Sequence, residues 1–218
     1  MGLALASAPS ICHAQSKAHF GVKAGANRAI LDGVLNEEPS YRLAPHGGVF
    51  LNLRASRAFA LQPELLISSQ GVHTERTYRY DTETYNLKSD TKLTYLAVPV
   101  LAKAYIGSMF YLEAGPQLGL LIGGKEKRES VYYINSGPEV EVRTVTEDAK
   151  KNYKSDVAAC GGLGVDFKNG LVVGARLNYG FTDINNNAER QQLREQLGIG
   201  GLHNRVMQFS VGYLFGKE

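Results

Sequence analysis

The sequence predicts an all-β protein: an eight-stranded antiparallel up-and-down β-barrel that spans a membrane. Three observations support this fold. Eight segments alternate apolar and polar residues, tight and long connections alternate between them, and the polar positions are rich in glycine. Glycine accounts for 24 of 218 residues, about 11% against an ordinary ~7%. The mean hydropathy is −0.20, and no apolar run reaches the ~18 residues of a membrane helix.

Composition excludes two further classes of protein. The hydrophobic fraction of 44% is that of a folded chain rather than a disordered one. The formal net charge of +3 comes from 24 basic and 21 acidic residues, which is too balanced for a dedicated nucleic-acid binder. We therefore expect a folded domain with no nucleic-acid partner.

The first 14 residues are predicted to be part of a signal peptide, which leaves residues 15–218 as one barrel domain. Cys12 and Ala14 are the small residues that precede a cleavage site before Gln15. A basic n-region is missing, so we expect the true start upstream of Met1; the alternative is a plain N-terminal tail. Cleavage would leave Cys160 as the only thiol, without a disulfide partner, packed in a strand.

Period-two alternation defines the strands in chain order. We expect strands at residues 18–27, 46–55, 59–72, 93–105, 109–122, 155–167, 171–183 and 205–215. Three connections are tight (around Arg57, around Gly107, and at 168–170), and four are long (28–45, 73–92, 123–154 and 184–204). Tight turns at one end and long loops at the other define an up-and-down meander. An even number of strands places both termini at the end with the tight turns.

Register at the tight turns supports the same faces, because directly opposed residues share a face. Centring the turns on Arg57, Gly107 and Asn169 opposes apolar residues in each hairpin. The expected pairs are Ala55 with Phe59, Ala104 with Phe110, and Phe167 with Leu171.

The polar face is predicted to line a narrow, filled lumen. It combines glycines with single charges, whereas a water-facing sheet would be dense in Lys, Glu and Thr. The predicted lumen charges are Lys23, Arg54, Glu64, Lys103, Glu113 and Arg176, together with Asp166. Lys103 is expected diagonal to Glu113 as an internal ion pair. An eight-stranded barrel has room inside only for side chains, so we expect a structural plug rather than an ion path.

The apolar face is predicted to meet lipid between two aromatic girdles. The girdle at the tight-turn end comprises Phe20, Phe59, Phe110, Phe167 and Phe215, and the long-loop girdle comprises Tyr179, Phe181 and Phe209. The alternative is a soluble, lipocalin-like barrel with its apolar residues inside.

Several segments together resemble a known family. They are Phe20–Gly25, Leu61–Leu66, Leu96–Lys103, Tyr111–Pro116, Asn178–Ile184 and Val211–Phe215. In this order they are similar to the PorT-type outer-membrane β-barrel domain of Bacteroidota, an eight-stranded barrel like OmpX and OmpA. The resemblance spans about residues 18–216. It implies an outer-membrane location and no single activity, since some members serve secretion or gliding machinery.

Motifs for catalysis or cofactor binding are not found. The chain has no GxSxG, HExxH, CxxC or P-loop sequence, so we expect no enzyme activity and no cofactor. His46, His73 and His203 could share the long-loop rim as a metal site, but solvated rim histidines are the favoured interpretation. We therefore predict no metal.

The long loops carry the remaining functional prediction. Residues 131–134 and 140–145 are expected to form a hairpin beyond the membrane, with Tyr132 and Tyr133 as contact residues, and residues 188–197 favour a helix. We expect an exported, monomeric outer-membrane barrel in contact with lipid, with a structural or binding role through extracellular loops. A component of secretion or envelope machinery is the alternative, and a lipid- or peptide-directed enzyme is the least favoured.

Overall fold

The computed structural model describes residues 17–33, 38–80, 83–134, 139–198 and 200–216, so the predicted signal segment at 1–14 lies outside the described residues. These residues form nine strands: β1 (Lys17–Asp32), β2 (Glu38–Arg54), β3 (Phe59–Tyr80), β4 (Glu83–Ile106), β5 (Phe110–Ile134), β6 (Glu139–Asp148), β7 (Asp156–Asp166), β8 (Leu171–Gly180) and β9 (His203–Leu214). A short 3₁₀ helix, η1 (Ala149–Asn152), follows β6, and a helix, α1 (Ala188–Gln196), precedes β9. No helix among these residues is long and apolar enough to cross a membrane.

Eight of the strands close into an antiparallel barrel. Each ring strand pairs with the ring strand that follows it in the chain, β5 pairs with β7, and β1 pairs with β9 to complete the ring. β6 pairs only with β5, at residues 125–133, and therefore lies outside the ring. The predicted eight-stranded up-and-down barrel is confirmed, with a ninth strand added at the long-loop end.

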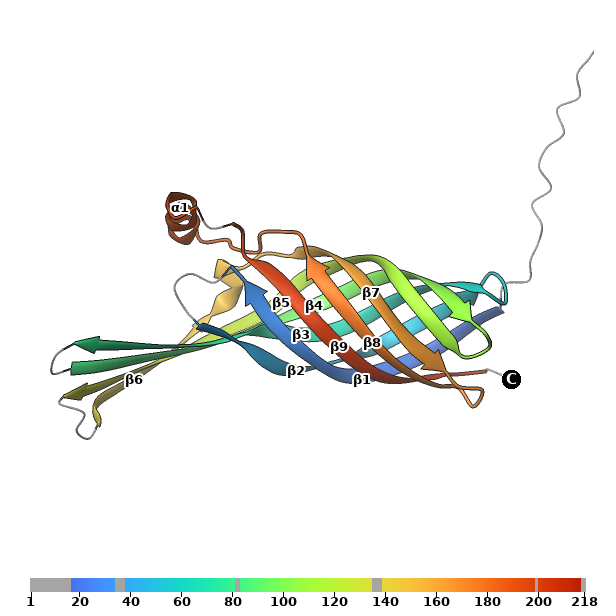
Figure 1. Cartoon of the computed structure of the whole chain (residues 1–218), viewed down its shortest axis with the longest axis horizontal. Helices are drawn as coiled ribbons and strands as arrows, with labels where there is room; N and C mark the ends of the chain where they lie inside the picture. Colours follow the sequence, from blue (N-terminus) through green and yellow to red (C-terminus); the bar gives the residue numbers. More distant parts are fainter. Residues whose placement is uncertain (1–16, 34–37, 81–82, 135–138, 199, 217–218) are drawn as a thin grey trace, which may run out of the picture.

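Strand extensions replace much of the predicted long loops. β3 and β4 stay paired as far as Tyr80 and Glu83, so the expected loop at 73–92 was wrong. β1 and β2 likewise extend into the expected loop at 28–45. The β5–β6 pairing confirms the hairpin predicted within 123–154, and α1 confirms the predicted helix. Figure 1 shows these hairpins projecting from the left of the barrel, with the tight turns and the C-terminus at the right.

Two of the three predicted turn registers are correct. Arg54 opposes Ala60, which continues the expected Ala55–Phe59 register, and Phe167 bonds the carbonyl of Leu171 as expected. The Gly107 hairpin is shifted, because Phe110 opposes Ile106 and not Ala104. A shift of two residues keeps every side chain on its predicted face.

The barrel places its apolar residues outside. Leu112, Leu163 and Leu177 are 50–60% exposed, and Lys103 and Arg176 are 1% and 3% exposed. Because a lipocalin-like barrel would bury the former and expose the latter, the soluble alternative is excluded.

Two apolar clusters close the inside of the barrel at different heights. The cluster at the turn end comprises Phe50, Ala60, Tyr105, Tyr111, Val172 and Leu214. The cluster at the loop end comprises Leu31, Val72, Leu93, Tyr95, Ala149, Tyr153, Ile184 and Leu202. Gly21 shows why the lumen needs glycine: a Cβ there would lie 2.3 Å from the ring of Phe50, its partner across β1 and β2.

Candidate functional site

The middle of the lumen holds a buried ion network centred on Glu64. Lys23 Nζ lies 3.0 Å from both carboxylate oxygens of Glu64. Arg176 donates to the same two oxygens at 2.9 and 3.0 Å. The Arg176 Nε also donates to Glu113 at 2.8 Å, so one guanidinium links β8 with β3 and β5. Gln62 adds a further hydrogen bond to Glu64 at 2.7 Å.

A second group of charges lies between this network and the tight turns. Lys103 is 3.9 Å from Glu113 and 4.0 Å from Asp166, and Arg54 is 3.9 Å from Asp166. The Tyr105 hydroxyl donates to Asp166 at 2.7 Å. Lys103 directly opposes Glu113 instead of lying diagonal to it, which corrects the predicted geometry while keeping the ion pair.

All seven predicted lumen charges therefore occur in one connected network. Each carboxylate of this network accepts from at least one cation or hydroxyl. Buried charges require such pairing because their desolvation cost is large. The network and the apolar cluster beside it fill the cross-section of a barrel that has little room to spare. This arrangement is suited to stability and closure.

The outer surface carries the predicted aromatic residues. Phe20, Phe59, Phe110, Phe167 and Phe215 are all exposed near the tight turns, and Phe20 stacks on Phe215 with ring centroids 6.0 Å apart. Tyr179 and Phe181 are exposed at the other end, 5.5 Å apart. Phe209 opposes Ala26 and Ala175 in the middle of the strands, so its assignment to the long-loop girdle was wrong.

The three histidines do not form a site. His46 is buried in the lumen between Gly25 and Ser68, whereas His73 opposes Asp90 and His203 opposes Asp32. Within the part of the chain that the structure describes, no group of three His, Cys, Asp or Glu residues could hold a metal ion. The buried thiol of Cys160 contacts Gln117 inside the barrel.

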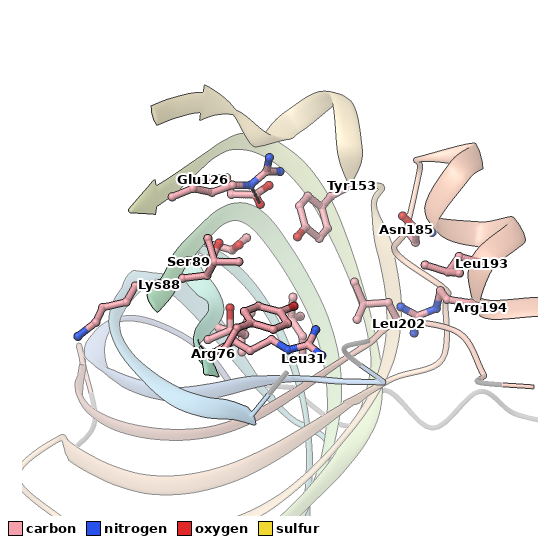
Figure 2. Close-up of a pocket in the computed structure, with 16 residues that line it drawn as sticks. Leu31, Arg76, Lys88, Ser89, Glu126, Tyr153, Asn185, Leu193, Arg194 and Leu202 are labelled. Carbon is pink, nitrogen blue, oxygen red and sulfur yellow. Dashed lines mark hydrogen bonds and ion pairs between the residues drawn. The ribbon is translucent and has the colours of Figure 1, made fainter. Parts of the chain in front are cut away.

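A cavity of about 380 Å³ opens at the loop end of the barrel, next to the apolar cluster at the loop end. Figure 2 shows its walls coming from β3, β4 and β5 on one side and the α1 region on the other. Its floor is apolar, formed by Leu31, Val72, Leu202 and the ring of Tyr153. The sequence did not predict this cavity, because its walls come from segments that were expected to be loops.

Three guanidinium groups and one carboxylate line the polar part of the cavity. Arg128 donates to Glu126 at 2.8 Å, and this hydrogen bond raises the pKa of Arg128 above its ordinary value. Arg194 binds the backbone carbonyls of Gly33 and Gly200, which ties α1 to the end of β1. Arg76 lies 4.5 Å over the Tyr78 ring, without a carboxylate partner among the described residues.

Lys88 lines the cavity but directs its charge elsewhere. Its ammonium lies 2.9 Å from Glu75, and Figure 2 shows it pointing away from the other lining residues. The cavity therefore has a net positive lining, from Arg76, Arg128 and Arg194 against Glu126.

An aromatic row crosses the same face of the extended sheet. Tyr78 opposes Tyr85, and Tyr85 opposes Tyr132, whose ring is 6.4 Å from that of Tyr85. Opposed residues share a face, so Tyr132 lies on the cavity side with Tyr78, and Tyr133 lies on the other side. Period-two alternation could have separated these two tyrosines if the register had been known.

Comparison with protein families identifies the class. Residues 13–186 match the outer membrane protein beta-barrel domain, and the chain belongs to this family. The protein is thus an outer-membrane β-barrel, with a location in the outer membrane.

Several solved structures of bacterial outer-membrane proteins are similar to the chain at low identity. Ail of Yersinia pestis, solved with the heparin analogue sucrose octasulfate, is 12% identical, with 91% of this chain and 99% of that chain covered and a TM-score of 0.42. Neisserial surface protein A is 13% identical over 90% and 98% of the two chains, also at 0.42. CarO2 of Acinetobacter baumannii is 10% identical over 89% and 99%, at 0.37. No relative among curated proteins matches the chain.

Proposed function

We propose that this outer-membrane barrel is a binding protein: its closed lumen is structural, and its extracellular end binds an external partner. The observation that carries the proposal is the cavity of about 380 Å³ at the loop end. Ligand sites are concave and apolar with a few directed polar groups, and this cavity has that composition.

The chemistry of the cavity favours an anionic, carbohydrate-like ligand. Arginine forks recognise sulfate, phosphate and carboxylate groups, and aromatic rings beside them pack against apolar ring faces. Arg76 and Arg128 supply the former, and Tyr78 and Tyr132 the latter. A protein partner contacting Tyr132 and Tyr133 is the other class that such a β extension serves.

The same proposal covers export, oligomeric state, the lack of catalysis and the narrower family. The chain is exported by a signal peptide that includes residues 1–14, works as a monomer, and has no catalytic role. We also propose that it is a PorT-type barrel, because the order of its segments resembles that family. The support is the small-residue cleavage pattern before Gln15 and the absence of enzyme motifs in the sequence.

Titration of the purified barrel with sucrose octasulfate tests the proposal. We expect Arg76→Gln to weaken binding by about tenfold, because charge-assisted hydrogen bonds contribute about 1.5–3 kcal/mol each. Arg79→Gln is the matched control, since Arg79 is on the same strand and outside the cavity. Equal binding by both variants, or no binding by the wild type, would count against this site.

A further inference from the structure

A second hollow lies on the outer wall of the barrel, where the strands leave the lipid-facing band. Its volume is about 570 Å³, and its lining comes from β4, β5, β6 and η1. Three lysines line it: Lys92, Lys125 and Lys150. We propose that this hollow binds the anionic phosphate headgroup of a membrane lipid.

Two of these lysines are directly opposed. Lys92 on β4 is the cross-strand partner of Lys125 on β5, and both side chains are exposed. Like charges in this position destabilise a sheet, so an anion bound between the two lysines would relieve their repulsion. On its other side Lys92 opposes Gly71, which supplies no side chain.

In the part of the chain that the structure describes, no carboxylate lies within ion-pair distance of Lys92 or Lys125. Asp148 opposes Lys125, but its side chain accepts from the backbone of Lys150 at 2.9 Å. Glu147 and Asp148 also line the hollow, so its lining has three lysines against two carboxylates. Glu147 opposes Glu126 and neither lysine of the pair. Asp90, two residues along β4, pairs with Arg42. Within the described residues none of the three lysines makes an ion pair.

The space between the lysines and the lipid band is open. Gly123 opposes Thr94 at this height, and a Cβ there would meet nothing closer than Thr94 at 4.0 Å. Ile122 forms the lower edge of the hollow, 48% exposed, next to the exposed Leu120 of the lipid-facing surface. Because the apolar band and the cations are contiguous, a lipid with its acyl chain on Ile122 and Leu120 places its headgroup at Lys92 and Lys125.

The test compares anionic and zwitterionic lipid. The full barrel is refolded into phosphatidylcholine vesicles, with and without phosphatidylglycerol, and unfolded with urea. We expect phosphatidylglycerol to raise the unfolding midpoint of the wild type and to have little effect on the double variant Lys92→Gln/Lys125→Gln. In phosphatidylcholine alone the double variant should be at least as stable as the wild type, because it removes the opposed charges. If the two lysines only stabilised the fold, the double variant would instead be less stable than the wild type in phosphatidylcholine alone.

Native mass spectrometry measures the bound lipid directly. We expect about tenfold less retained phosphatidylglycerol for the double variant and for Gly123→Leu, which fills the hollow without changing its charge. Lys127→Gln is the matched control, since Lys127 pairs with Glu129 outside the hollow. Equal retention by the wild type and both variants would overturn the proposal. An equal rise of the midpoint with inorganic phosphate would assign the site to a free anion and overturn the lipid.

Discussion

At the scale of single residues, the lumen depends on one shared carboxylate. Glu64 accepts from Lys23, Gln62 and Arg176, and none of these side chains is more than 8% exposed. Removing a shared acceptor leaves two buried cations without their strongest partner, and that cost exceeds the net contribution of an intact pair. Removing Glu64 should therefore reduce stability more than removing one partner of a surface ion pair.

Glu64→Gln should lower the free energy of unfolding by about 3–5 kcal/mol, because the replacement keeps the volume and removes the charge. Urea titration of the barrel in lipid vesicles measures the change. Glu75→Gln is the control: Glu75 pairs with Lys88 at the surface, where a loss of about 0–1 kcal/mol is expected. A loss below about 1 kcal/mol for Glu64→Gln would show that the network contributes little.

At the scale of elements, the projecting hairpins are separate from the closure of the ring. β5 pairs with β7 over Phe110–Gly119, whereas its pairing with β6 begins at Lys125. The ring is complete below this point. The extensions can therefore carry binding surfaces without determining whether the barrel forms.

Replacing residues 129–144 by Asn-Gly tests this separation. Arg128 and Val145 are directly opposed, so a two-residue turn can join them. We expect the shortened barrel to keep its heat-dependent shift in gel migration, because the β5–β7 pairing stays whole and the β4–β5 pairing is lost only where it reaches residues 129–134. We also expect it to lose contacts made through Tyr132. A protein that no longer shifts on heating would show that the β5–β6 hairpin is needed for folding.

At the scale of the whole molecule, side chains fill the lumen along its length. The apolar cluster around Tyr105 and Tyr111, the charge network and the loop-end cluster around Leu93 and Tyr95 lie one after another along the lumen. Eight strands leave little space beyond these side chains.

Planar-bilayer recordings of the purified protein should show no steady conductance. The physical reason is that ions would have to pass two apolar clusters and displace a paired charge network. A large, stable conductance would contradict the closed lumen. The Glu64→Gln variant should be recorded in the same way. Brief channel openings seen only in that variant would show that the charge network is what blocks ion passage.

The sequence alone determined which segments cross the membrane and which face of each meets lipid. Alternation is local: lipid requires apolar residues at Leu112 and Leu177, and a narrow lumen requires glycines and paired charges such as Arg176. Beyond the membrane both faces of a strand meet water, so residues 73–80 and 83–92 lack this alternation. The sequence pattern therefore predicts a loop where the structure has paired strands. Only the tertiary structure decided which charges meet at Glu64, how the extensions form the cavity, and that Lys92 opposes Lys125. These depend on strand register and on contacts between distant segments, which no local pattern encodes.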